Sequence, residues 1–355
     1  MASVNNVSIH WVRTPLFEPY QLSYGPVEFL NSIFCRAELD DGRAGWGEST
    51  PLPGYCPSTA DDVWATMERA CEDSLGKEAA GIFSSAPEGD GFLTTALHTA
   101  CEEAVLGAPT ETGEVPLIGL IQGGTPDSLI AGLESARGKG YAEFKMKAGV
   151  YPPGHEAGLI REVQSCLHEG EWLRLDANQG LDLNSAKIVS GACDPARVRY
   201  LEQPLPELDW EGSAALAKSS PIPIALDEAI TGLESLDRAA RSRAGSYIKL
   251  KWMKQGSSAA LKEMVERARQ HGFQVIFGNG VATGWNGRQE SVFWLRYLAA
   301  DGFAGEMNGF LKVPGTVSGL SAQNGRAIVA LPPPEAPGFA TGNIIKSKTY
   351  GPRSG

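Results

Sequence analysis

Several features are scarce in this sequence of 355 residues, and each shortage excludes a class of protein. Basic residues are in deficit, with 31 Lys and Arg against 42 Asp and Glu and a formal net charge of −11. This balance argues against nucleic acid as a partner, because phosphate binding needs a basic face. No apolar run reaches the roughly 18 residues of a transmembrane helix, and the opening "MASVNNVSIHWVRTP" lacks the basic-then-apolar layout of a signal peptide. We therefore expect no membrane association and a cytoplasmic location.

Cysteine and histidine are also rare. The six cysteines form no C-x-x-C pair, and we interpret them as reduced thiols because a chain of this length needs no disulfide framework. The five histidines are scattered and accompany none of the acidic motifs, so a zinc site is not expected. Candidate functional residues are therefore carboxylates and lysines.

The first part of the chain has the sequence pattern of an α+β unit, with strands followed by helices. Residues 4–13 and 29–47 read as strands, and residues 61–76 and 90–107 have helical spacing with Asp at the start and Gly at the end. We interpret residues 1–112 as an α+β capping (lid) domain.

The second part alternates short apolar runs with helical stretches. Eight such strand candidates lie between residues 113 and 312, and alternation of this kind predicts a parallel sheet. Eight units predict an α/β fold, a (β/α)8 TIM-type barrel, with a doubly wound open sheet as the alternative. Residues 313–355, rich in Pro and Gly, are expected to return to the capping domain and complete it.

Charged residues recur at the ends of five consecutive strand candidates. Lys147 ends "AEFKMK", Asp176 ends "WLRLD", Glu202 ends "RYLE", Asp227 ends "IPIALD" and Lys251 ends "SYIKLK". The intervals of 29, 26, 25 and 24 residues each match one strand–helix unit. Taken alone, any one of these residues is more readily explained as a strand-end salt bridge or a solvated turn residue. Because the carboxyl ends of barrel strands converge on one mouth, five at matching positions indicate an active site.

Three carboxylates on adjacent strands predict a site for a hard divalent cation. Asp176, Glu202 and Asp227 offer only oxygen ligands, which suit Mg²⁺, with Mn²⁺ as the alternative. Such a metal ion neutralises the charge that develops on a substrate carboxylate when its α-proton leaves.

The flanking lysines have the chemistry of acid/base residues. Lys147 and Lys251 are expected to face an anionic substrate from two sides, and a desolvated lysine near a cation loses proton affinity. Lys145 and Lys249 precede them by two residues, on the same face of each strand. We expect Lys145 to hold the substrate carboxylate or to lower the proton affinity of its neighbour, and Lys249 to pair with the Asp-Glu pair 227–228.

These motifs resemble the enolase superfamily, in its muconate-lactonizing-enzyme subgroup, and the resemblance covers nearly the whole chain. It implies Mg²⁺ ligation by the three carboxylates, with the two strand-end lysines as acid/base residues on opposite faces of the substrate. Ser257 stands where the family has the second Gly of a turn. The motifs are "KMK" (145–147), "DAN" (176–178), "EQP" (202–204), "DE" (227–228) and "KLKWMKQGS" (249–257).

Two stretches separate this chain from other branches of the superfamily. The mandelate-racemase branch has a His after the seventh strand, where this chain reads "FGNGVATG". That stretch also mimics a dinucleotide fingerprint, but it opens the seventh unit of a barrel and not a nucleotide-binding half. Dipeptide epimerases carry Asp-x-Asp near the eighth strand to hold the substrate's ammonium. This chain reads "GEMNGF" there, and Glu306 with Asn308 is the expected substitute.

Substrate-binding residues are expected in the lid and around the mouth. Segments 17–25 and 51–58 are expected to close over the barrel, which brings Tyr20 and Tyr55 to the pocket. The remaining candidates for substrate contact are Asn178, Trp285, Lys145 and Glu306.

The implied reaction is Mg²⁺-dependent abstraction of the α-proton of a carboxylate through a metal-stabilised enolate. We favour a racemase or epimerase of an amino-acid-like carboxylate. The alternatives are a dehydratase of a hydroxylated amino acid such as a 3-hydroxyproline, an o-succinylbenzoate synthase or cycloisomerase, and, in another class, a non-catalytic barrel. The partner is a small-molecule carboxylate, and the resemblance implies a homo-oligomer.

Overall fold

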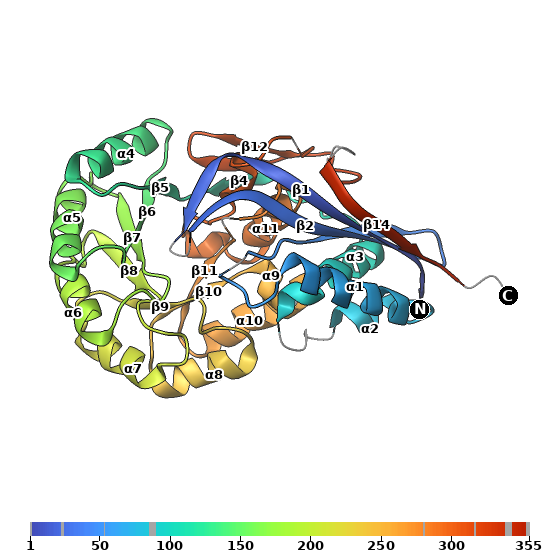
Figure 1. Ribbon diagram of the computed structural model, residues 1–355, viewed down its shortest axis with the longest axis horizontal. Helices are drawn as coiled ribbons and strands as arrows, with labels where there is room; N and C mark the ends of the chain where they lie inside the picture. Colours follow the sequence, from blue (N-terminus) through green and yellow to red (C-terminus); the bar gives the residue numbers. More distant parts are fainter. Residues whose placement is uncertain are drawn as a thin grey trace.

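The computed structural model describes residues 2–22, 25–52, 54–84, 90–279, 281–315, 317–337 and 343–352. An antiparallel sheet with three helices lies beside a parallel sheet that is ringed by helices (Figure 1). Within these ranges, no helix is both long and apolar enough to cross a membrane.

The N-terminal unit is a four-stranded antiparallel sheet packed against helices, with strand order β14-β1-β2-β3. Gly45 and Gly47 allow helix α3 to approach β3, since a Cβ on them would lie 2.3 Å from Ala104 N and 2.1 Å from Ala96 O. The elements are β1 (Val4–Leu22), β2 (Gly25–Leu39), β3 (Ala44–Ser49), α1 (Ala60–Ser74), α2 (Ala79–Ser84), the 3₁₀ helix η1 (Gly91–Leu93) and α3 (Thr95–Leu106).

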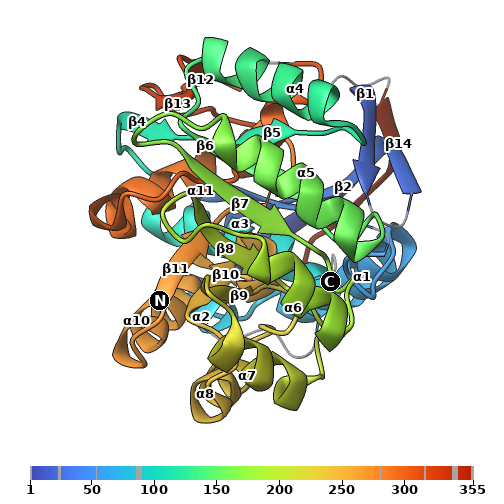
Figure 2. The same ribbon diagram turned by 90° about the vertical axis from the view of Figure 1, so that its left-hand side faces the viewer.

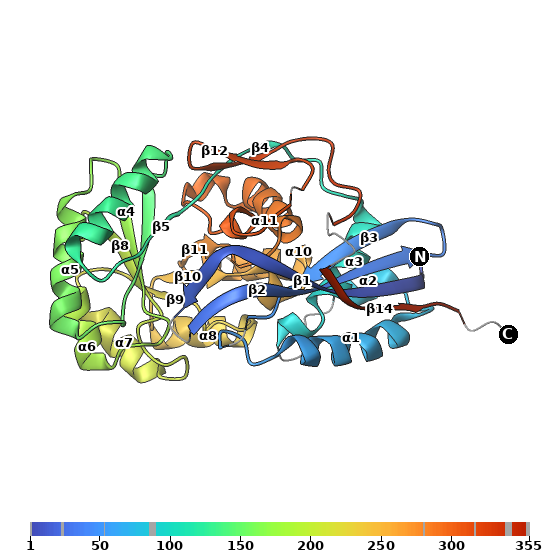
Figure 3. The ribbon, with the colours of Figure 1, turned by 45° about the horizontal axis from the view of Figure 1, so that its top comes forward.

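The C-terminal segment divides between two sheets. Strand β14 (Ile344–Tyr350) pairs with β1 in the N-terminal sheet. Strands β12 (Leu320–Gln323) and β13 (Arg326–Val329) instead form a separate antiparallel sheet with β4 (Gly113–Pro116), seen above α11 in Figure 3. The described part of the tail therefore contacts both units, and the domain boundaries at 112 and 312 stay a prediction.

The parallel sheet contains seven strands in sequence order, from β5 to β11. Helices follow the strands and cover the outside of the sheet (Figure 2). The strands are β5 (Gly119–Ile121), β6 (Glu143–Lys147), β7 (Trp172–Asp176), β8 (Val198–Glu202), β9 (Ile224–Leu226), β10 (Tyr247–Leu250) and β11 (Gln274–Phe277). The helices are α4 (Pro126–Gly138), α5 (Pro153–Ser165), α6 (Leu183–Gly191), α7 (Trp210–Ser219), α8 (Leu233–Ser242), α9 (Trp252–Gln255), α10 (Ser258–Gln270), α11 (Gly284–Tyr297), η2 (Ala299–Asp301) and η3 (Asn308–Leu311).

A short segment around Gly305 occupies the position of the eighth strand. Gly305 forms a parallel bridge with Leu117, and its N–H donates to Pro116 O at 2.8 Å. On its other side, Glu306 N donates to Phe277 O of β11 at 2.9 Å. The predicted α/β barrel fold is thus confirmed, with its eighth strand reduced to a bridge that links both sheet edges.

Two buried carboxylates of the N-terminal unit cap helices of the barrel. Glu48 accepts hydrogen bonds from Thr283 N at 3.0 Å and Asn286 N at 3.1 Å, at the start of α11. Glu102 accepts from Ser258 N at 2.9 Å, at the start of α10. Because carboxylates satisfy free N–H groups and complement the helix dipole there, these contacts fix the two units against each other.

Candidate active site

Strand β6 contains two lysines, whose burial among apolar side chains would be energetically costly. Phe144 and Met146 are buried in the apolar core that the sheet forms with its helices. Lys145 and Lys147 point to the other side of the strand and line a pocket at the mouth of the barrel. The lysines therefore meet carboxylates rather than apolar side chains.

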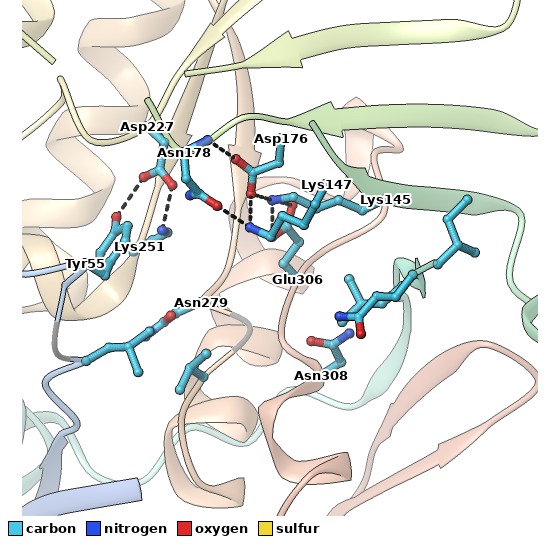
Figure 4. Close-up of a pocket in the computed structure, with 15 residues that line it drawn as sticks. Tyr55, Lys145, Lys147, Asp176, Asn178, Asp227, Lys251, Asn279, Glu306 and Asn308 are labelled. Atoms are coloured by element: carbon cyan, nitrogen blue, oxygen red, sulfur yellow. Dashed lines mark hydrogen bonds and ion pairs between the residues drawn. The ribbon is translucent and has the colours of Figure 1, made fainter. Parts of the chain in front are cut away.

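Figure 4 shows side chains from several strand ends meeting in this pocket. Of the five periodic charges, Lys147, Asp176, Asp227 and Lys251 line it. Glu202 is fully buried next to it and contacts Lys145. The complete lining is Leu52, Tyr55, Leu120, Ile121, Gln122, Lys145, Lys147, Asp176, Asn178, Asp227, Lys251, Asn279, Val281, Glu306 and Asn308.

One side of the pocket is built on Asp176. Lys147 Nζ lies 2.8 Å from Asp176 Oδ2 and also contacts the side-chain oxygen of Asn178. Asn178 has a φ of 39°, a left-handed conformation that asparagine tolerates better than most residues. This turn lets its backbone N–H donate to Asp176 Oδ1 at 3.1 Å while its amide donates to Glu228 Oε1 at 3.1 Å. Asn178 thus orients Lys147 from the end of β7.

The other side is built on Asp227. Lys251 Nζ donates to Asp227 Oδ2 at 2.7 Å, and Tyr55 OH donates to Oδ1 at 2.8 Å. Lys254 Nζ donates to the backbone oxygen of Asp227 at 2.7 Å. Sequence reasoning gave Lys254 no role, although its spacing of three residues from Lys251 places both on one face of a helical turn. Asp227 is therefore held by two lysines and by a tyrosine from the lid segment.

Lys145 lies between three carboxylates in the pocket floor. Its Nζ lies 2.9 Å from Asp176 Oδ2, 3.0 Å from Glu202 Oε2 and 3.0 Å from Glu306 Oε2. Burial alone would lower the pKa of Lys145, but these three carboxylates hold it well above its ordinary value. In this arrangement Lys145 is an ammonium group that neutralises neighbouring acids.

The carboxylates of the site respond differently to burial. Burial opposes ionisation of Asp176 and Asp227, but the lysines beside them hold both pKa values below the ordinary range. Burial raises the pKa of Glu202 to about 7, with Lys145 opposing the shift and the charge of Asp176 adding to it. Asp176 and Glu202 are direct neighbours across β7 and β8 and repel each other.

The donor chemistry of these acids fits a hard divalent cation. Asp176 and Glu202 are paired in register, and Asp227 lies two residues beyond Ala225, the partner of Glu202 on β9. Among the described residues, no group of three or more His, Cys, Asp and Glu is arranged to hold a metal ion. In this structure each of the three carboxylates contacts a lysine, Asp176 and Glu202 through Lys145 and Asp227 through Lys251. Mg²⁺ prefers oxygen ligands, and a bound cation would relieve the repulsion between these carboxylates.

Other predicted substrate contacts are placed differently. Trp285 packs against Val12 and Phe34 and does not line the pocket. Tyr20 lies in β1, but its side chain lies outside the described part of the chain. Lys249 contacts Glu306 Oε1 at 2.6 Å rather than the Asp-Glu pair 227–228.

Two features of the quoted motifs have structural reasons. Ser257 caps α10, accepting from Ala260 N at 3.2 Å and donating to Phe83 O at 2.9 Å, which explains a serine in place of the family glycine. In the "GNGVATG" stretch, Asn279 N donates to Glu290 at 3.3 Å, and Thr283 N donates to Glu48. These two backbone N–H groups therefore already donate hydrogen bonds to carboxylates of the protein.

Comparisons with known proteins agree with this geometry. Residues 129–292 match the family model described as "Enolase C-terminal domain-like". An aromatic dipeptide epimerase from Herpetosiphon aurantiacus is 27% identical over 296 residues, covering 79% of this chain and 83% of the relative. A cis-3-hydroxy-L-proline dehydratase from Roseibium aggregatum is 28% identical over 288 residues, covering 76% and 77%.

A solved structure shows the same fold along the whole chain. The dipeptide epimerase from Cytophaga hutchinsonii, complexed with Mg and the dipeptide D-Ala-L-Val, superposes with a TM-score of 0.86 at 17% identity and covers 98% of this chain and 99% of its own. As the strand-end motifs predicted, the chain is similar to the enolase superfamily, and the relatives that it matches are enzymes of that superfamily.

Proposed function

We propose that the protein is a Mg²⁺-dependent racemase or epimerase of an amino-acid-like carboxylate. The observation that carries the proposal is the pair of lysines on either side of one pocket. Lys147 is bound to Asp176 and Lys251 to Asp227, so each amine is held by its own carboxylate. Two amines flanking an α-carbon allow a proton to leave from one face and to return from the other.

The three strand-end carboxylates are the residues that would hold the metal. Asp176, Glu202 and Asp227 would bind Mg²⁺, which when bound supplies positive charge next to the substrate carboxylate. Added positive charge in a buried site lowers the proton affinity of nearby lysines. One lysine then takes the α-proton as a neutral amine, and the other, still an ammonium, donates its proton to the opposite face of the carbanion.

The lid segment completes this arrangement. Tyr55 comes from the N-terminal unit, and its ring centroid lies 3.7 Å from Lys251 Nζ. Apolar side chains at the mouth, among them Leu52, Ile121 and Val281, limit the access of water to the reacting carbon. The lid thereby both orients one base and protects the carbanion from uncontrolled protonation.

Proton exchange in D₂O tests the proposal. The protein is incubated with Mg²⁺ and a library of chiral carboxylates, and the products are followed by NMR and polarimetry. We expect deuterium at Cα together with inversion for at least one substrate class. The absence of exchange with every carboxylate contradicts the proposal.

Dehydration of a hydroxylated amino acid is the second candidate. It is favoured by the similarity to the cis-3-hydroxy-L-proline dehydratase, which is 28% identical over 288 residues, against 27% over 296 residues for the epimerase. The same lysine would remove the α-proton, and the opposite ammonium would protonate the departing β-hydroxyl. In the same experiment, loss of water without inversion indicates a dehydration, either of a hydroxylated amino acid or of the o-succinylbenzoate synthase kind according to the substrate that reacts. An isomer in which a lactone ring has opened or closed indicates a cycloisomerase.

A further inference from the structure

Asn178 lies between one of the proposed bases and a buried acid. Its side-chain oxygen accepts from Lys147 Nζ, a contact drawn in Figure 4, and its Nδ2 donates to Glu228 Oε1 at 3.1 Å. The ammonium group of a lysine offers only donors, and an ionised carboxylate offers only acceptors. The reverse orientation of the amide would set N–H against ammonium and oxygen against carboxylate. The two unlike neighbours therefore fix which end of the Asn178 amide faces the base.

The amide oxygen of Asn178 is a distinctive acceptor for Lys147. Lys147 Nζ also lies 2.8 Å from Asp176 Oδ2, but Lys145 Nζ lies 2.9 Å from the same oxygen. Asp176 is in addition one of the carboxylates proposed to hold Mg²⁺. Of these two acceptors, the Asn178 oxygen is the one that is shared neither with a second lysine nor with a proposed metal ion. The position of Lys147 Nζ is therefore expected to depend on how Asn178 is held.

Glu228 is itself held by the neighbouring strand of the barrel. It is 6% exposed and lies outside the described lining of the pocket. Gln203 fixes the turn that carries it, because Gln203 Oε1 accepts from Asp227 N at 2.9 Å and from Ala229 N at 3.2 Å. Gln203 is 1% exposed, and its Nε2 donates to Leu205 O at 3.0 Å. Since the N–H groups on both sides of Glu228 are bound, its carboxylate starts from a fixed backbone.

We propose that Glu228 is a positioning residue for Lys147 and acts through the amide of Asn178. Gln203, Glu228 and Asn178 then form a chain of hydrogen-bonded contacts that leads from the end of β8, through the turn after β9, to the base on β6. The inference rests on the proposed racemase or epimerase function and adds to it a residue that serves one of the two lysines and not the other.

Exchange of the two enantiomers of one substrate measures this effect. Glu228→Leu is assayed for Cα deuteration in D₂O at saturating Mg²⁺, with Glu228→Gln, which keeps an acceptor oxygen, as the matched control. We expect kcat of Glu228→Leu to fall at least about tenfold for the enantiomer whose α-proton faces Lys147, because this base is displaced. The KM values and the exchange of the other enantiomer are expected to stay nearly unchanged, and Glu228→Gln is expected to keep most of the rate. An equal loss for both enantiomers, or an equal loss in both variants, overturns the inference and leaves the racemase proposal standing.

A double-mutant cycle tests the route through Asn178. Asn178→Gly removes the amide, and glycine tolerates the φ of 39° at this position. If Glu228 acts through that amide, adding Glu228→Leu to Asn178→Gly is expected to lower exchange by less than about twofold. Losses that multiply in the double variant overturn the inference, because Glu228 would then act by another route.

Crystal structures separate the inference from the proposed function. In metal-free Glu228→Leu, we expect the Asn178 side chain to turn and its oxygen to leave hydrogen-bond distance of Lys147 Nζ, in contrast to the wild type. Glu228→Ser, whose hydroxyl is too short to replace the carboxylate, serves if Glu228→Leu does not fold. Unchanged positions of Lys147 and Asn178 in the folded variant overturn the inference, whatever the activity. Absence of exchange in the wild-type protein overturns the racemase proposal alone.

Discussion

The aromatic ring of Tyr55 lies 3.7 Å, centroid to Nζ, from Lys251, and both side chains bind the carboxylate of Asp227. Tyr55 belongs to the N-terminal unit, whereas Lys251 directly follows strand β10. The unit that covers the barrel mouth therefore also orients one of the proposed bases.

Removal of the Tyr55 hydroxyl tests this relationship. Tyr55→Phe keeps the ring over Lys251 but loses the hydrogen bond to Asp227, and we expect kcat/KM to fall about tenfold, as for loss of a hydrogen bond to a charged group. Tyr55→Leu removes the ring as well, and its kcat/KM is expected to fall further. Steady-state exchange assays of both variants measure the effect, and full activity in Tyr55→Leu contradicts it.

Helix α3 holds the turn that follows Lys251. Thr99 Oγ1 accepts from Trp252 Nε1 at 3.0 Å and donates to Gly256 O at 3.2 Å. We expect Thr99→Val to slow exchange several-fold for the enantiomer whose α-proton faces Lys251, and to leave the other enantiomer nearly unchanged, because only this base is displaced. Thr99→Ser keeps the hydroxyl and serves as the matched control. An equal loss for both enantiomers argues for a general structural role.

Glu290 predicts a pH dependence of stability. Burial raises its pKa from the ordinary 4.5 to about 8. The folded state binds this proton more tightly than the unfolded state, so the contribution to stability is full below about pH 4.5 and is lost as the pH rises through about 8. Glu290→Gln removes this proton equilibrium and is expected to melt higher than the wild type at pH 8 to 9. The variant Glu263→Gln, at an exposed site on α10, is the control, and parallel melting profiles of wild type and Glu290→Gln count against the prediction.

Magnesium binding is expected to release protons. Glu202 has a pKa of about 7 without metal, and a ligand carboxylate must be ionised. Calorimetric titration with Mg²⁺ should therefore give heats that change with the ionisation enthalpy of the buffer. Glu202→Gln is expected to weaken binding at least about tenfold, with Glu263→Gln again as the control. Binding that is unaffected by Glu202→Gln excludes this residue as a ligand.

The parts of the site that sequence predicts are those that follow the period of the barrel. The five strand-end charges can be recognised in the sequence because each strand–helix unit repeats at nearly the same length. The structure brings four of them together in one pocket, and the fifth, Glu202, contacts Lys145 beside it. Their recognition needs no knowledge of side-chain directions beyond the alternation along a strand.

Contacts between residues on opposite sides of the barrel cannot be predicted from this repeat. The pairing of Lys249 with Glu306 depends on a segment that closes the sheet through a single bridge and has no strand pattern. Trp285 has an aromatic side chain of the kind that often lines pockets, but the docking of the N-terminal sheet places it against Val12 and Phe34. Such contacts are set by the packing of distant elements, which local propensity does not encode.

The most direct measurement follows each lysine separately. Lys147→Ala and Lys251→Ala are assayed for Cα deuteration of the two enantiomers of one substrate in D₂O with Mg²⁺. Because each amine serves one face of the carbon, we expect each variant to lose at least about 10²-fold in exchange of one enantiomer, and the two variants to lose opposite enantiomers. Equal exchange of both enantiomers in either variant contradicts the assignment of the two lysines to opposite faces.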